Sequence, residues 1–175
     1  MTWPRRERTW QPRSVTATPS VALIDQALLE RTLEAARSSP RLRAVHSFHT
    51  SATDNLHRFL NAFVRGTYLP PHRHRETPKA KSFLVLRGEL GCFVFDDKGK
   101  VIERYILGRA GLLGIDLQPG LWHTVAPLGD SAVCFEVKPG PWDVATDREL
   151  APWAPANDAE LRAFLAGSVA RLSQS

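Results

Sequence analysis

A run of short apolar segments between residues 59 and 138 most constrains the fold, because turn residues separate them and no helical periodicity intervenes. The loop from Asp96 to Lys100 is typical of a hairpin, with Gly99 placed for positive φ. Closely spaced strands without helices between them predict an all-β fold, an antiparallel barrel or jelly roll. The expected strands are 60–64, 82–86, 91–95, 101–106, 112–117, 122–125 and 132–137.

The segments on either side of this run have a different character. Residues 1–19 form a basic, proline-containing tail without periodicity, which predicts disorder. Ser20 is placed to cap a helix that ends near Ser38, because the residue before Pro40 avoids the helical region. The predicted division is therefore a tail (1–19), a helix and lead-in (20–58), a barrel (59–138) and a C-terminal segment whose helix, capped by Asn157, packs on the barrel (139–175).

The charge pattern and the apolar runs of the chain predict neither a nucleic-acid partner nor a membrane partner. The net charge is +5, but four arginines and one glutamate among residues 1–13 account for +3 of it. No basic stripe interleaved with aromatic residues remains, so we expect no nucleic-acid partner. No run of 18 apolar residues predicts a membrane helix, and no uncharged apolar run follows Arg5 and Arg6 as a targeting signal requires. We expect a cytoplasmic protein.

Two cysteines, Cys92 and Cys134, lie inside apolar strand-like runs. Buried reduced thiols that pack as small hydrophobic groups are the simplest interpretation. A disulfide or a metal-ligand role is the alternative.

Three histidines form the most informative pattern. His72 and His74 are separated by one residue, so on a strand both imidazoles point to the same face and can reach one ion. Glu76 continues the same parity and would add an oxygen ligand if the strand extends that far. Roughly fifty residues later, Gly120 marks a tight turn just before His123 on another strand. Neutral imidazole is a good ligand for transition metals.

The spacing of these residues resembles the paired motifs of the cupin superfamily, with Gly66, five residues, His72-x-His74 and Gly88, then Gly120-x-x-His123. Over about residues 21–156 the chain is also similar to the WbuC family of cupin-fold metalloproteins. That second resemblance rests on ARSSPRLR (36–43), PHRH (71–74), FD (95–96), WHT (122–124), EVKPGP (136–141) and WAP (153–155).

The resemblance implies a cupin fold, the double-stranded β-helix or jelly-roll barrel, with helices at both ends. It implies that the two motifs lie on neighbouring strands, so that His72, His74 and His123 converge on a divalent metal: iron, zinc, manganese or nickel. It further implies a small-molecule ligand, such as a carbohydrate or sugar nucleotide, a context of O-antigen biosynthesis, and a homodimer.

Two positions depart from the cupin pattern. The glutamate that cupins usually carry seven residues before the closing glycine of the first motif is Lys81 here, and the asparagine often found four residues after the last histidine is Pro127. The resemblance therefore implies a three-histidine site, with Glu76 as a substitute fourth ligand. Lys81 is expected to neutralise an acidic ligand or to hydrogen-bond a substrate oxygen, because a cation beside a metal weakens its binding.

Lys81 also makes the chain similar to the deoxysugar-nucleotide epimerases, which share the barrel and need no metal. In that interpretation His72 or His74 is the base and Lys81 stabilises the enolate oxygen, with Tyr68 or Tyr105 as the acid.

Three functions therefore remain open. The first is a metal-binding cupin that acts on or holds a small polar molecule, the second is the metal-free epimerase or isomerase, and the third is a ligand-binding module without turnover.

Overall fold

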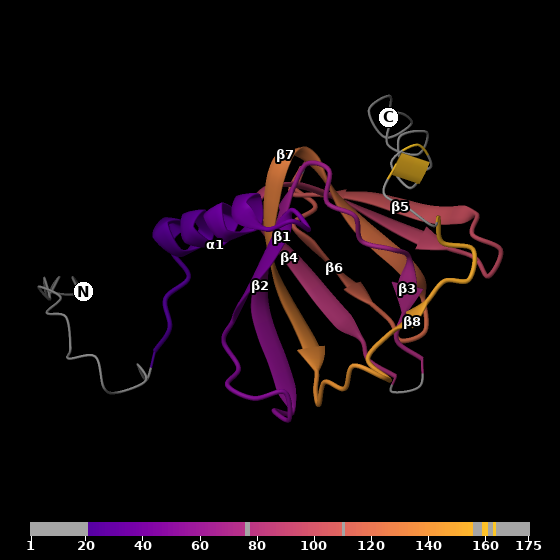
Figure 1. Cartoon of the computed structure of the whole chain (residues 1–175), viewed down its shortest axis with the longest axis horizontal. Coiled ribbons are helices and arrows are strands. Elements are labelled where there is room, and N and C mark those ends of the chain that lie inside the picture. Colours follow the sequence, from indigo (N-terminus) through magenta and orange to yellow (C-terminus); the bar gives the residue numbers. More distant parts are fainter. Residues whose placement is uncertain (1–20, 76–77, 110, 156–158, 161–162, 164–175) are drawn as a thin grey trace, which may run out of the picture.

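The computed structural model describes residues 21–75, 78–109, 111–155, 159–160 and 163. Among these residues, eight antiparallel strands join in one sheet that curves around an interior, with a helix outside it (Figure 1). The all-β prediction is confirmed. The elements are α1 (Gln26–Ser38), β1 (Arg43–Ser47), β2 (Leu56–Val64), β3 (His72–Arg73), β4 (Lys81–Phe95), β5 (Val101–Leu107), β6 (Gly114–Leu117), β7 (Trp122–Pro139) and β8 (Glu149–Leu150).

Two long strands organise the sheet. The segments expected separately at 82–86 and 91–95 belong to the single strand β4, and those at 122–125 and 132–137 belong to β7. β4 and β7 pair from Ser82↔Val137 to Phe95↔Trp122, with register shifts on either side of residues 87 and 88. Because such irregularities bend a strand and increase its twist, each strand continues around the curve of the barrel instead of ending at a turn.

Gly88 occupies a position on β4 where a side chain does not fit. Its φ is +72°, and a Cβ there would lie 2.3 Å from the carbonyl oxygen of Ser131 on β7. The variant Gly88→Ala is therefore expected to lose about 1–3 kcal/mol of unfolding free energy through the backbone conformation alone, and more through the clash. The matched control is Gly129→Ala, whose added Cβ meets nothing within 4 Å. Urea unfolding would measure both, and equal midpoints would contradict this account of Gly88.

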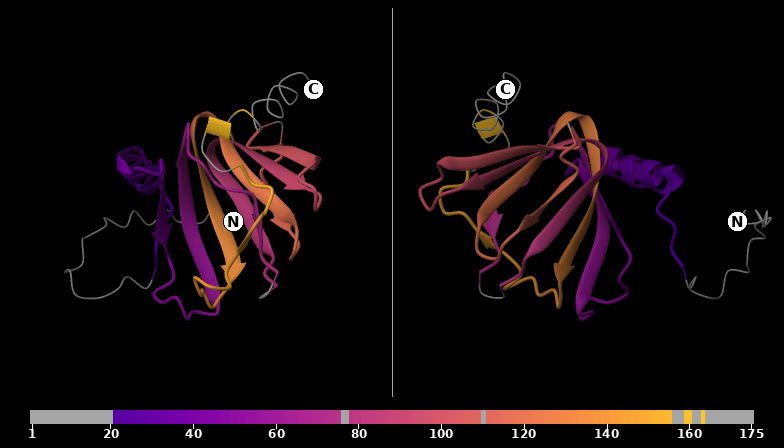
Figure 2. Two further views of the ribbon diagram at one scale, coloured as in Figure 1. Left: turned by 45° about the vertical axis from the view of Figure 1, so that its right-hand side comes forward. Right: turned by 180° about the vertical axis from the view of Figure 1, so that it is seen from behind.

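Helix α1 packs against the outer face of the sheet, on the side away from β3 and β8 (Figure 2). It begins at Gln26, later than the predicted start after Ser20, because the side chain of Asp25 accepts a hydrogen bond from the Leu28 backbone at 2.8 Å and caps the first turn. Ser20 lies outside the described residues. The side chains that join the helix to the sheet are Leu28, Leu29, Leu33 and Ala36 on α1, Leu60 and Ala62 on β2, and Val133 on β7.

The interior of the barrel has an apolar core and, next to it, a polar end. A cluster contributed mainly by β4 and β7 forms the apolar core and includes Phe83, Leu90 and Val125. Cys92 and Cys134 lie in this cluster as buried thiols without a disulfide, and burial raises the pKa of Cys92 to about 12. The two cysteines therefore pack as small apolar groups. The polar end carries the candidate site.

The chain after β7 returns across the sheet edge and covers that polar end. β8 pairs with β3, where His72 faces Leu150 and Arg73 faces Glu149. Arg73 points away from the histidines: its guanidinium donates two hydrogen bonds of 2.8 Å to Glu149 and lies 4.0 Å above the Trp122 ring. The segment is thus held by the sheet register and by an ion pair.

The strands extend beyond the predicted barrel limits of 59–138, since β1 precedes residue 59 and β8 follows residue 138. The predicted tail (1–19) and the cap of the predicted C-terminal helix, Asn157, lie outside the described residues. In the described part of the chain, no helix has the length and apolar character needed to cross a membrane.

Candidate metal centre

The sheet register brings the three predicted histidines together. His72 on β3 pairs directly with His123 on β7, and His74 follows two residues after His72. The ring centroids of His72 and His123 are 4.5 Å apart, and those of His72 and His74 are 5.4 Å apart. One ring nitrogen of each histidine lies within 4.8 Å of those of the other two, and all three side chains are buried. The predicted convergence of the two motifs therefore exists in the fold.

Backbone carbonyls fix the orientation of all three rings. His72 Nδ1 contacts the carbonyl oxygen of Pro70 at 3.0 Å, His123 Nδ1 contacts that of Leu121 at 2.9 Å, and His74 Nδ1 contacts that of Asp147. A carbonyl oxygen only accepts, so each Nδ1 must carry the proton and donate it. In a neutral imidazole the proton-free lone pair is then on Nε2, the arrangement that a metal-binding histidine needs.

The histidines are held in their neutral form. Burial, followed by the positive charge of Lys81, lowers the pKa of His123 to about 3 and that of His74 to about 4. Burial also lowers the pKa of His72 well below its ordinary value, with His123 as the next cause. Neutral rings with free Nε2 lone pairs are ligands at physiological pH without the loss of a proton.

Two of these Nε2 atoms have no hydrogen-bond partner within the described ranges of the chain. His74 Nε2 and His123 Nε2 are buried, and neither finds a donor among the described residues. A buried polar atom without a partner costs about 1–3 kcal/mol of folding free energy, and a ligand bound to these atoms would remove that cost. Three neutral imidazoles converging with unpartnered lone pairs fit a divalent transition metal, and this buried histidine triad could hold one.

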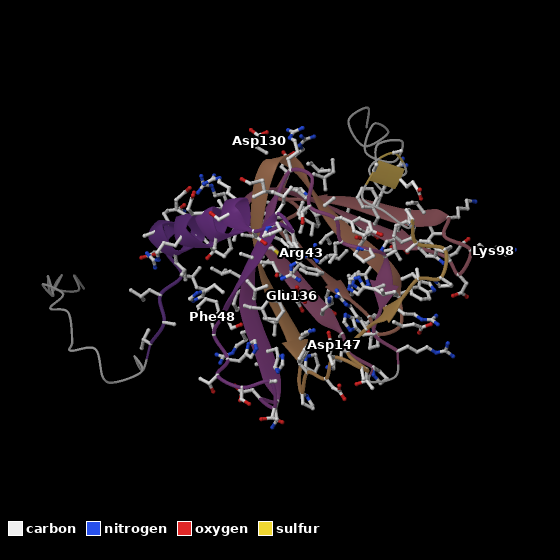
Figure 3. The ribbon with its side chains drawn as sticks, viewed as in Figure 1. Arg43, Phe48, Lys98, Asp130, Glu136 and Asp147 are labelled. Carbon is white, nitrogen blue, oxygen red and sulfur yellow. The ribbon has the colours of Figure 1, made fainter. Side chains whose placement is uncertain are left out.

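The histidines face a cavity of about 230 Å³ that opens between β1, β2, β4, β7 and the segment before β8. Arg43 on β1, Glu136 on β7 and Asp147 in the segment before β8 lie near the middle of the barrel, whereas Lys98 and Asp130 mark its outer ends (Figure 3). Five cationic side chains line the cavity, namely Arg41, Arg43, Lys81, Lys138 and Arg148. Glu136 and Asp147 are the carboxylates that the described residues contribute to its lining.

Lys81 lies at the start of β4 inside this cavity, where it forms a buried ion pair. Its Nζ is 3.3 Å from Glu136 Oε1, and both side chains are less than a tenth exposed. Asn61 of β2 donates to the other Glu136 oxygen at 2.5 Å. Lys81 is thus a fixed cation beside the histidines, with its charge balanced by Glu136.

A second buried network closes the site from the C-terminal side. The carboxylate of Asp147 accepts hydrogen bonds from Lys138 at 2.9 and 3.0 Å and from Lys79 at 3.1 Å. Burial by itself would raise the pKa of Asp147, but the two lysines outweigh it and hold that pKa below its ordinary value. Because the Asp147 carbonyl orients His74, this network connects the closing segment to the histidine cluster.

The other predicted site residues have different positions. Glu76 lies outside the described residues, so its role as a ligand stays a prediction. The Tyr68 hydroxyl donates to the Pro155 carbonyl at 2.7 Å, and Tyr68 packs beside Phe93 and Trp122 instead of lining the histidine cavity. The Tyr105 hydroxyl donates to Glu103 at 2.6 Å on the exposed side of β5. Of the residues proposed for proton transfer, the fold places His72, His74 and Lys81 together.

Sequence reasoning missed Glu136, Asp147 and the three arginines. Glu136 carried a weak signal, a carboxylate inside the apolar run from Val133 to Val137. Asp147 and Arg148 lie in an irregular segment about 70 residues from the first histidine motif, so no local spacing connects them with it.

Comparison with solved structures shows that the fold is that of a cupin. The capsular polysaccharide assembling protein CapF of Staphylococcus aureus superposes with a TM-score of 0.53 and 21% identity, over 64% of this chain and 32% of CapF. The chain therefore spans about a third of the length of CapF. L-ribose isomerase of Cellulomonas parahominis superposes with a TM-score of 0.50 and 17% identity, over 64% of this chain and 70% of the isomerase.

Within that fold class, residues 24–107 match the sequence model of a family described as a domain of unknown function (DUF6016). The matched part contains His72, His74 and Lys81 and ends before His123. No curated protein sequence matches the chain. The narrower resemblance to the WbuC family stays a prediction.

Proposed function

We propose that this protein is a cupin that holds a divalent metal ion on His72, His74 and His123 and binds a small polar ligand beside it. The observation that carries the proposal is the pair of buried, unpartnered Nε2 atoms on His74 and His123, in a cluster whose Nδ1 atoms are all engaged. Iron, zinc, manganese and nickel all accept imidazole ligands. The metal, when bound, would act as a Lewis acid toward an oxygen of the ligand.

The chain's own residues would position that ligand. The cavity of about 230 Å³ accommodates a small metabolite, and Lys81 offers a fixed ammonium group to a ligand oxygen. The names of the structural relatives, a capsular polysaccharide assembling protein and a sugar isomerase, support a role in carbohydrate or sugar-nucleotide metabolism such as O-antigen synthesis. The homodimer and the cytoplasmic location stay predictions.

A metal-free isomerase is the second candidate, because Lys81 lines the same cavity as the three histidines. Burial lowers the pKa values of the two predicted bases, His72 and His74, and leaves their rings unprotonated, as a base must be, while Lys81 would stabilise an enolate oxygen. The two predicted acids of this mechanism, Tyr68 and Tyr105, do not line this cavity. The third histidine argues against this candidate, because such a proton transfer does not require it.

Elemental mass spectrometry of tag-free protein tests the metal proposal. We expect close to one equivalent of a divalent metal in the wild type, and a loss of most of it in His74→Ala and His123→Ala, because each variant removes one of three ligands. His46→Ala on β1 is the matched control, since His46 lies outside the metal cluster and the cavity lining. Circular dichroism checks that the variants fold.

The proposal fails if the wild type takes up no metal even after incubation with iron, zinc, manganese or nickel. It also fails if His46→Ala loses as much metal as the triad variants. Metal uptake without turnover of any ligand would make the protein a ligand-binding module, the third hypothesis, and would leave the metal site itself intact.

A further inference from the structure

Three arginines meet at the cavity, and no carboxylate in the described part of the chain forms an ion pair with them. Arg41 precedes β1, Arg43 begins β1, and Arg148 precedes β8, yet all three line the cavity that contains the histidines. Among the described residues, none of the three forms an ion pair. Arg43 donates at 2.5 Å to the backbone carbonyl of Tyr68, which fixes its guanidinium but leaves other donors free.

The two carboxylates of the cavity are already engaged elsewhere. Glu136 pairs with Lys81, and Asp147 pairs with Lys79 and Lys138. The three guanidinium groups therefore remain as an excess of positive charge. Burial lowers the pKa of Arg43, and the charges of Arg41 and Arg148 also lower it, so both of these arginines lie close enough to repel Arg43. Like charges gathered in one cavity are destabilising unless an anion joins them.

From this arrangement we infer that the mouth of the cavity binds the phosphoryl group of a small phosphorylated ligand, whose other end lies at the histidines. A phosphoryl group carries close to two negative charges and three acceptor oxygens, which suit several guanidinium groups at once. The cavity of about 230 Å³ is smaller than the about 300–1,000 Å³ of sites for drug-sized ligands, so a molecule of sugar-phosphate size fits it. The inference rests on the proposed function for the end of the ligand that faces the histidines.

Binding of the metal and binding of the phosphoryl group are also coupled by charge. A divalent metal adds positive charge to a cavity that already has five cations and two carboxylates. An anion at the arginines offsets that charge, so phosphate and metal should each bind more tightly in the presence of the other. This coupling is reciprocal, because the two equilibria share one thermodynamic cycle.

Isothermal titration with inorganic phosphate tests the assignment on metal-loaded protein. We expect saturable binding to the wild type and at least tenfold weaker binding to Arg43→Gln and to Arg148→Gln. Arg148 is exposed, so its replacement leaves the fold intact even if that of Arg43 does not. The matched control is Arg104→Gln, which removes the same charge from an exposed position on β5 outside the cavity lining and should bind phosphate as the wild type does.

Two further titrations define the chemical class of the ligand and separate the two proposals. Ribose 5-phosphate should bind more tightly than ribose and than malonate, and a preference for malonate would overturn the phosphoryl assignment. Absence of phosphate binding, or equal weakening in Arg104→Gln, would overturn the inference while the metal content still stood. Phosphate binding that depends on Arg43 and Arg148, in a protein that takes up no metal even after incubation with it, would sustain the anion site and refute the metal proposal alone.

Discussion

The variant Asp147→Ala is expected to lose about 3–5 kcal/mol of unfolding free energy, one of the largest effects of any single replacement in this protein. Asp147 accepts from both Lys79 and Lys138, and all three side chains are less than a tenth exposed. Removal of the carboxylate leaves two buried ammonium groups without their counter-ion. Urea unfolding followed by circular dichroism measures the loss.

The same variant should weaken metal binding by about 10–100-fold, because the lysine contacts of the Asp147 carboxylate hold in place the backbone carbonyl that orients the ring of His74, and a loss of such support has this effect in metal sites. Asp130→Ala is the matched control: Asp130 pairs with Arg65 on the exposed surface, where an ion pair contributes about 0–1 kcal/mol. If Asp147→Ala is as stable as Asp130→Ala and keeps its metal affinity, the buried network does not hold the closing segment over the histidines.

The histidine triad could be predicted from the sequence because its signals are local. Alternation along a strand fixes the relation of His72 to His74, and the turn at Gly120 places His123 at the start of a strand. The two motifs lie far apart in the sequence, so only the resemblance to cupins predicts that they come together in the fold. The sheet register, in which His72 pairs with His123, provides the geometry that the resemblance implied.

Strand boundaries were predicted less well where a strand contains turn residues. Gly88 and Pro127 are typical of turns, so each long strand was divided in two. In the fold, Pro127 pairs with Leu90 and Gly88 pairs with Ala132, at places where the long strands bend. The two-residue strands β3 and β8 are too short to have a periodicity, and they exist because tertiary pairing supplies their partners.

The charged groups around the histidines could not be predicted, because the role of each depends on a partner that is far away in the sequence. Lys81 and Glu136 are 55 positions apart in the chain, and Arg43 and Arg148 are more than 100 apart. Lys81 stands out in the sequence only because it departs from the cupin pattern. Its partner Glu136 gives it a structural role that the sequence does not reveal, and this role decides how a variant of Lys81 should be interpreted.

Single replacements of the Lys81–Glu136 pair are expected to be strongly destabilising, whereas the double replacement should not be. Lys81→Met leaves Glu136 buried with Asn61 as its remaining partner, and Glu136→Leu leaves Lys81 beside the histidines without a counter-ion. Each should lose about 3–5 kcal/mol of unfolding free energy, while an apolar pair of similar volume often restores stability. Urea unfolding of the four proteins gives the coupling energy of the pair directly.

The double variant Lys81→Met/Glu136→Leu also separates the two candidate functions, because it keeps the fold and all three histidines. If the histidines hold a metal, this variant should retain its metal content and bind it at least as tightly as the wild type, since the cation nearest the site is gone. If the protein is a metal-free isomerase, the wild type contains no metal and the double variant loses the group that stabilises the enolate. Elemental analysis of the wild type and the double variant therefore decides whether Lys81 lies beside a metal site or belongs to an isomerase that needs no metal.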